Sequence, residues 1–171
     1  NSVTATGAGQ TIALFELDGY VASDITAYEN KFNLPKVPLK NILVDGFNGS
    51  AGGGADEVTL DIELQIAMAP GVNSVLVYEG PNTSPGVLDT YNKIATDNLA
   101  KQISTSWGLA EEFDSPTELN TENSIFKQMA AQGQSIYAAA GDSGAFDNGS
   151  TISVDDPASQ PFMTGVGGTK L

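Results

Sequence analysis

The segment from Gly52 to Gly71, GGGADEVTLDIELQIAMAPG, predicts the element around which the rest of the chain is organised. Three glycines lead into a helix that is expected to end before Pro70. Glu57 and Asp61 are four residues apart, so on a helix they share one face and lie one turn from each other. A neighbouring apolar stripe is expected to face the core, formed by Leu60, Leu64, Ala67 and Met68.

The two acids of this helix allow two interpretations. Like charges one turn apart repel, and the repulsion grows when the groups are partly buried. Glu57 and Asp61 are therefore candidates for a pair in which one carboxyl group holds a proton close to the other. The alternative is that both are ordinary acids near a helix N-terminus, where negative charge is favoured. The helix by itself does not decide between these interpretations.

The composition excludes several kinds of site. The 171 residues, enough for one domain or part of a larger one, carry 7 basic and 21 acidic side chains and a net charge of −14. This charge argues against nucleic acid or an anionic membrane as a partner and is compatible with work in acid. The sequence contains no histidine and no cysteine, so it offers no Ser-His-Asp triad, histidine metal site, thiolate or disulfide. Acid–base chemistry is left mainly to Asp and Glu.

Apolar runs of strand length alternate with helix-like segments along the whole chain. Because the runs are continuous and lack period-two alternation, they predict an α/β fold with a mostly parallel sheet and helices on both faces. The expected strands are 11–15, 39–44, 74–78, 102–107, 135–140 and 161–166, and the expected helices are 23–32, the helix within 52–69, 84–100 and 117–132.

Sites in such sheets lie outside the carboxyl ends of the strands, where Trp107-Gly108 and Gly141-Asp142 are expected to fall. There is no phosphate-binding glycine motif, so a nucleotide-binding domain of Rossmann type has little support.

Five segments in order together resemble one family, the sedolisins, which are serine-carboxyl peptidases with a subtilisin-like fold. Their similarity to the family covers nearly the whole chain. The segments are GQTIALFEL (9–17), DEVTLDIE (56–63) followed by APG (69–71), ISTSWG (103–108), AAAGDSG (138–144), and VDDPASQP (154–161) with GGT (167–169).

The resemblance implies catalytic roles for three acids. Glu57 would be the general base that accepts the proton of a nucleophilic serine, and Asp61 would hydrogen-bond and orient Glu57. Asp142 would sit in the oxyanion hole as a protonated acid and donate a hydrogen bond to the tetrahedral intermediate. A carboxylic acid donates only while it is protonated, so acid conditions suit Asp142, and burial at the sheet end is expected to favour that form.

The resemblance also implies residues that support the catalytic group and bind substrate. Ser106 and Gly108, with Trp107 between them, would bind an extended peptide through backbone pairing. Glu16 matches an acid that extends the carboxyl network behind the triad, although a solvated acid at a strand end is an equally good interpretation.

The sequence departs from the family pattern in one important respect. The segment that carries the nucleophilic serine, and with it the calcium site, lies downstream of the region matched here. Residues 1–171 are therefore expected to form the N-terminal part of a single peptidase catalytic domain, incomplete without a C-terminal partner segment. The serine is expected from a second polypeptide, and calcium from the same missing segment. Asp156, which replaces a common aromatic residue, is expected to alter a substrate pocket.

The sequence is compatible with two functions of different kinds. The first is an acid-active endopeptidase or tripeptidyl-peptidase, secreted or held in an acidic compartment, with a peptide or protein substrate. The alternative is a catalytically inactive relative that binds peptides or a partner through the same cleft.

Overall fold

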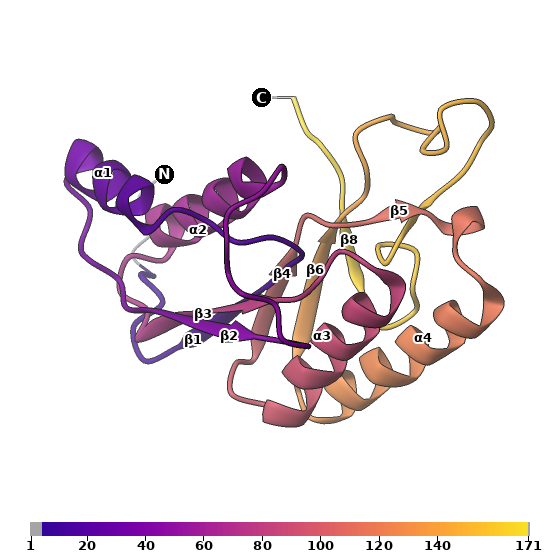
Figure 1. Cartoon of the computed structure of the whole chain (residues 1–171), viewed down its shortest axis with the longest axis horizontal. Coiled ribbons are helices and arrows are strands. Elements are labelled where there is room, and N and C mark those ends of the chain that lie inside the picture. The colour runs from indigo at the N-terminus through magenta and orange to yellow at the C-terminus, as the bar shows by residue number, and fades with distance from the viewer. Residues whose placement is uncertain (1–4, 171) are drawn as a thin grey trace.

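The computed structural model describes residues 5–170, which form one six-stranded sheet with helices on both faces (Figure 1). The strand order is β2-β3-β1-β4-β6-β8, and every pairing between neighbours is parallel. The predicted parallel sheet is therefore confirmed. The six strands are β1 (Thr11–Glu16), β2 (Leu39–Leu43), β3 (Ser74–Glu79), β4 (Gln102–Thr105), β6 (Ser135–Ala139) and β8 (Thr164–Val166).

The helices lie in two pairs on opposite faces of the sheet (Figure 1). Alternate residues of β1 enter the two cores, with Leu14 packing toward α1 and α2 and Phe15 toward α3 and α4. The parallel crossovers thus bury both faces of the central strands, which explains their uninterrupted apolar sequence. The four helices are α1 (Ala22–Phe32), α2 (Ala55–Met68), α3 (Ser84–Asp97) and α4 (Pro116–Ala131).

The expected apolar stripe of α2 is wrong, because the opposite face of the helix is buried. Leu60, Leu64 and Met68 are exposed, while the buried residues of α2 are Val58, Asp61, Ile62 and Ile66. Both sets follow helical spacing, so the sequence pattern could not distinguish them. The face that packs on the sheet carries Asp61 inward with it, which brings an acid to the edge of the core.

Three short elements were absent from the sequence-based prediction. β5 (Leu109–Ala110) pairs antiparallel with β7 (Asp155–Asp156), and the 3₁₀ helix Glu111–Phe113 follows β5. Strands of two residues leave no periodic pattern in a sequence. Their pairing holds the segment after β4 against the segment before β8, close to the carboxyl edge of the sheet.

None of the helices within residues 5–170 combines the length and apolar character needed to cross a bilayer.

Candidate active site

The glycine loop before α2 is held at the carboxyl end of β1 by Asp18. The Asp18 carboxylate accepts hydrogen bonds from the backbone N–H groups of Gly52, at 2.9 Å, and Gly54, at 2.7 Å. Gly54 also lies directly against the indole of Trp107, where a Cβ atom would stand only 2.5 Å from Cη2. A side chain at this position would push the loop away, so glycine allows the N-terminus of α2 to approach the end of β4.

A buried pair of acids, Glu16 and Asp61, lies next to the contact between α2 and the end of β4. The Trp107 Nε1–H donates to Glu16 Oε2 at 2.7 Å, and the Ser106 hydroxyl donates to Asp61 Oδ1 at 2.8 Å. The Glu16 and Asp61 carboxyl groups lie close enough to share a hydrogen bond when one of them is protonated. Their remaining oxygens, Glu16 Oε1 and Asp61 Oδ2, receive no hydrogen bond from any amide or hydroxyl group of the described residues. A proton shared between the two acids satisfies both of these oxygens.

The electrostatics of the pair favour protonation of Glu16. Burial, followed by the charge of Asp61, raises the pKa of Glu16 well above its usual range. Burial also raises the pKa of Asp61, to about 6, while the hydrogen bond from Ser106 opposes that rise and the nearby charge of Glu57 adds to it. Glu16 therefore serves as the neutral donor and Asp61 as the acceptor. The alternative of a solvated Glu16 is wrong, since its side chain is fully buried.

A cavity of about 340 Å³ opens beside this pair, at the carboxyl ends of β4 and β6. Ser106, Gly108 and Asp142 all line it, together with Asp155. Gly108 has no room for a side chain, because a Cβ atom there would meet Asp155 Oδ1 and the backbone oxygen of Asp156. At Gly108 the segment after β4 therefore carries no side chain, which suits backbone pairing with an extended peptide.

The acids of the cavity differ from expectation in their burial. Asp142 is exposed, so the described part of the chain does not provide the burial that was expected for it. Asp155, by contrast, is buried, and this burial together with the charge of Asp147 raises its pKa to about 7. Asp155 lies within a segment that resembles the family, but the resemblance implied no role for it.

No family model matches the chain. It is 36% identical to kumamolisin from Bacillus sp. (strain MN-32), over 96% of this chain and 31% of that protein. It is 30% identical to sedolisin from Pseudomonas sp. (strain 101), over 99% of this chain and 32% of that protein. The solved structure of Pseudomonas sedolisin, a serine-carboxyl proteinase complexed with two molecules of pseudo-iodotyrostatin, superimposes with a TM-score of 0.88. That match has 28% identity and covers 98% of this chain and 50% of the other.

The chain belongs to the sedolisin family. Its parallel sheet is the subtilisin-like sheet of the sedolisins. The chain spans about a third of the length of the curated relatives and half of the solved sedolisin chain.

The predicted site residues of this sedolisin relative fall into two adjoining groups. Glu57 and Asp61 lie one turn apart on α2, with Glu16 and Trp107 behind Asp61. Ser106 belongs to both groups, since it contacts Asp61 and lines the cavity with Gly108 and Asp142. The contacts of Asp61 in the described residues are with Ser106 and Glu16, and Glu57 acts on it through charge.

Sequence reasoning missed two supporting acids. Asp18 anchors the glycine loop, and Glu79 lies buried at the end of β3. Burial, together with the charge of Asp18, raises the pKa of Glu79 to about 7. A signal for both was present in the sequence, because Glu79 ends a buried strand and Asp18 lies two residues after one.

The buried acids predict that the protein loses stability as the pH rises. Asp61, Glu79 and Asp155 have native pKa values of about 6, 7 and 7, above the values of about 4 in an unfolded chain. Between about pH 4 and pH 7 the native state therefore holds more protons than the unfolded state, and the free energy of unfolding falls. Urea unfolding of the complete protein at a series of pH values should be most difficult near pH 4.

Glu79→Gln removes one of these titrating groups and should flatten the decline toward pH 7. The exposed Glu112→Gln is the matched control and should leave the slope unchanged. A free energy of unfolding that increases from pH 4 to pH 7 would contradict the assignment.

Proposed function

We propose that this chain forms the N-terminal part of an acid-active serine-carboxyl peptidase that hydrolyses peptide bonds. The observation that carries the proposal is the position of Ser106. Its hydroxyl group contacts Asp61 of the acidic helix, and Ser106 also lines the cavity shared with Asp142. This position supports a site in which a base on α2, a backbone segment for the substrate and an oxyanion donor would work together at the carboxyl edge of the sheet.

In this proposal each acid performs a separate task. Glu57 accepts the proton of a serine nucleophile, and Asp61, one turn along α2, orients Glu57. Below about pH 6 Asp61 carries a proton of its own, so it can donate to the Glu57 carboxylate. Asp142 in its neutral form donates to the oxygen of the tetrahedral intermediate. Glu16 and Trp107 fix the orientation of Asp61 from behind.

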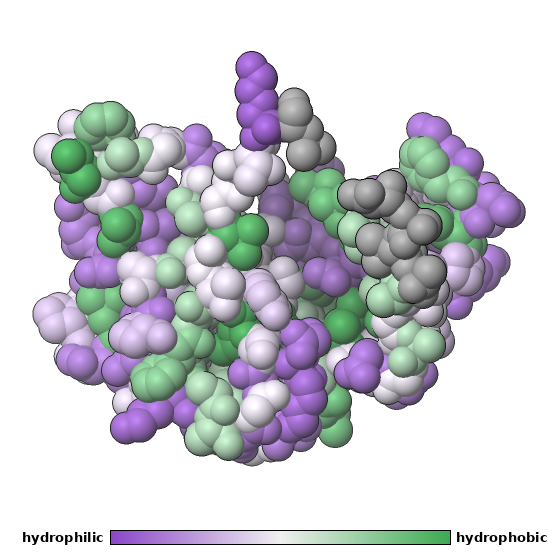
Figure 2. Space-filling model, turned by 180° about the vertical axis from the view of Figure 1, so that it is seen from behind, coloured by the Kyte–Doolittle hydropathy of each residue, from purple (hydrophilic) through white to green (hydrophobic). Residues whose placement is uncertain are grey.

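The serine is proposed to come from a segment beyond residue 171, on the same precursor or on a second polypeptide. One face of the sheet supports this proposal, because α1 and α2 cover only its β1–β3 half (Figure 1). Seen from behind, the surface is recessed between the end that carries α1 and the end that carries the loop after β6 (Figure 2). Both faces of a parallel sheet are normally covered, so this face calls for a further layer.

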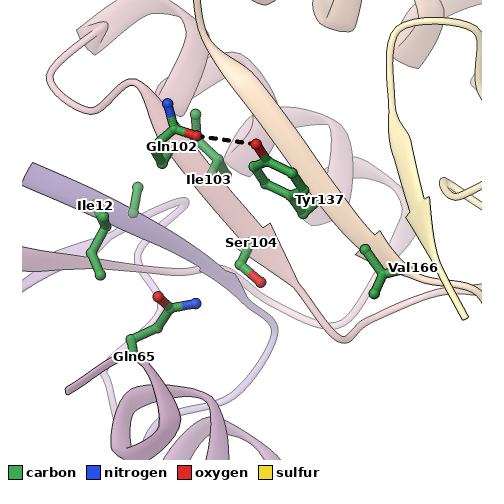
Figure 3. A pocket seen from close by; sticks show the side chains of 8 residues that line it. Ile12, Gln65, Gln102, Ile103, Ser104, Tyr137 and Val166 are labelled. Atoms are coloured by element: carbon green, nitrogen blue, oxygen red, sulfur yellow. Dashed lines mark hydrogen bonds between the residues drawn. The ribbon is translucent and has the colours of Figure 1, made fainter. Parts of the chain in front are cut away.

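The recess contains a cavity of about 330 Å³ beside α2. Gln65 of α2 and Ile12 of β1 line one side of the cavity. The other side is lined by Ser104, Tyr137 and Val166 (Figure 3). The exposed leucines of α2 extend the same apolar border, with Leu64 50% exposed. A helix of the missing segment placed here would bury both the sheet face and the adjoining side of α2. The solved sedolisin chain is about twice as long as this chain and the curated relatives are more than three times as long, which is ample length for such a segment.

The proposal extends to a calcium site and to the location of the protein. The described residues contain no group of three or more acidic side chains arranged to hold a metal ion. A calcium site is proposed only for the missing segment. Because Asp142 must be neutral, the enzyme is proposed to work outside the cell or in an acidic compartment.

The first test concerns the general base. Glu57→Gln keeps the shape of the side chain but cannot accept the serine proton, so kcat of the assembled enzyme should fall by about 10⁴-fold. Asp61→Asn should be severe but milder, because Asp61 orients the base. Glu63→Gln on the same helix is the control and should retain activity. Near-normal turnover in Glu57→Gln would remove this residue from the mechanism, and a wild-type protein that binds peptides without cleaving them would favour the inactive relative.

The second test concerns the oxyanion donor. Activity should follow a bell-shaped pH profile that falls toward neutrality as Asp142 ionises. Asp142→Asn supplies a donor that does not titrate, so it should lower the maximum rate by up to ~10²–10³-fold and move the alkaline limb upward. Asp142→Ala should be worse, since no donor remains. The measurement is kcat/KM against pH, and an alkaline limb that stays in place in Asp142→Asn would contradict this role.

The third test concerns the uncovered face. In the complete protein, Leu64→Asp would bury an unpaired charge under the missing segment and should lower the free energy of unfolding by several kcal/mol. Leu99→Asp is the matched control, since Leu99 is 62% exposed and lies after the end of α3. Equal and small effects of the two substitutions in thermal or urea unfolding would show that the α2 face stays open.

A further inference from the structure

A second cavity lies on the α3–α4 side of the segment after β4. It has a volume of about 170 Å³, below the roughly 300–1,000 Å³ of pockets that take drug-sized ligands, so it suits a single side chain. Trp107, Leu109 and Val87 give it apolar walls. Glu122 of α4 and Asp156 of β7 also line it.

The two acids of this cavity are buried and face each other. Glu122 is 5% exposed and Asp156 is 2% exposed, and their carboxyl groups are within hydrogen-bonding reach. The Gln160 side-chain amide donates to Asp156 Oδ1 at 2.8 Å. No amide or hydroxyl group of the described residues donates to Glu122 Oε2. One carboxyl oxygen at the cavity is therefore left without an N–H or O–H donor from this chain.

The surroundings supply more negative charge and no cation. Burial raises the pKa of Glu122 well above its usual range, and the charges of Asp156, Asp114 and Glu118 add to the effect. The one ion pair in the described part of the chain joins Lys93 to Asp97, and neither residue lines the cavity. A buried pair of acids without a cation is costly in its ionised form, so a cation brought in by a ligand would take the place of the shared proton and offset the repulsion between the two carboxylates.

We infer that this cavity binds the side chain of a lysine or arginine residue of the peptide substrate, with the cationic group held between Glu122 and Asp156. The long aliphatic stem of such a side chain matches the apolar walls, and its charged end reaches the acids. Arginine can also contact a carboxylate through two parallel hydrogen bonds. On binding, the proton shared by the two acids passes to solvent.

The inference rests on the proposed function, because it requires a peptide along Ser106–Gly108. The two cavities share Gly108 and Leu109, so a peptide on this segment passes both. The Asp142 cavity takes the reacting bond in the proposed mechanism. The Glu122 cavity then takes a side chain from another position of the same peptide and sets sequence preference.

The test is a positional scan with the assembled enzyme. One lysine is moved through an otherwise neutral peptide, and each peptide is compared with its counterpart carrying norleucine, which has an uncharged side chain of similar length. One position should favour lysine by ~10–100-fold in kcat/KM, the range expected for hydrogen bonds to a charged group. The double variant Glu122→Gln, Asp156→Asn should lose that preference while still cleaving the norleucine peptides.

Glu118→Gln, one turn away on α4, is the control. It removes one charge where the double variant removes two, at a half-buried residue that does not line the cavity, and glutamine can keep the capping contact with Ser115, so the lysine preference should persist. The inference is overturned if no position favours lysine, or if the preference survives in the double variant, which would place the cation elsewhere, such as at Asp155. Failure of the proposed function looks different, since then no peptide, including those with norleucine, is cleaved by any form.

Discussion

The shared proton between Glu16 and Asp61 is the constraint on which the rest of the site depends. Glu16 ends β1, Asp61 lies on α2, and the hydrogen bonds from Trp107 and Ser106 add the segment after β4. Three elements that are remote in sequence therefore meet at two carboxyl groups. With both acids ionised and no cation nearby, the pair would repel, so the arrangement of α2 on the sheet itself depends on a proton.

Other buried acids that favour their protonated form lie near the carboxyl edge of the sheet. Glu79 ends β3, Asp155 follows the loop after β6, and Glu122 faces Asp156 beneath the segment after β4. Each of these acids is buried, and burial raises its pKa or that of its partner. The acidic residues behind the net charge of −14 are therefore not all on the solvated surface, because some of them are buried and favour their neutral form. The buried acids stabilise the fold while they are protonated, and the proposed chemistry needs a protonated Asp142 as well, so both point to acid conditions.

Two parts of the molecule are open to solvent. Asp142 is exposed after β6, and a separate cavity lies on the sheet face beyond α2. The solved sedolisin is twice as long as the matched region, so the family has length for a further layer over this face. Water exclusion strengthens hydrogen bonds and ion pairs, so a layer over the open parts would favour the proposed chemistry.

The sequence by itself determined the features that depend on local pattern. Continuous apolar runs alternating with helices were enough to give a parallel sheet, and the spacing of Glu57 and Asp61 placed both acids on one face of a helix. Only the tertiary structure decided which face of α2 is buried, because the 58–62–66 and 60–64–68 rows are both apolar and local spacing cannot distinguish them. It also decided the contact of Trp107 with Glu16, across 91 residues, and the meeting of Glu122 with Asp156. Such contacts are set by how strands and helices pack, and no periodicity within one segment records which distant side chain will fill the space beside it.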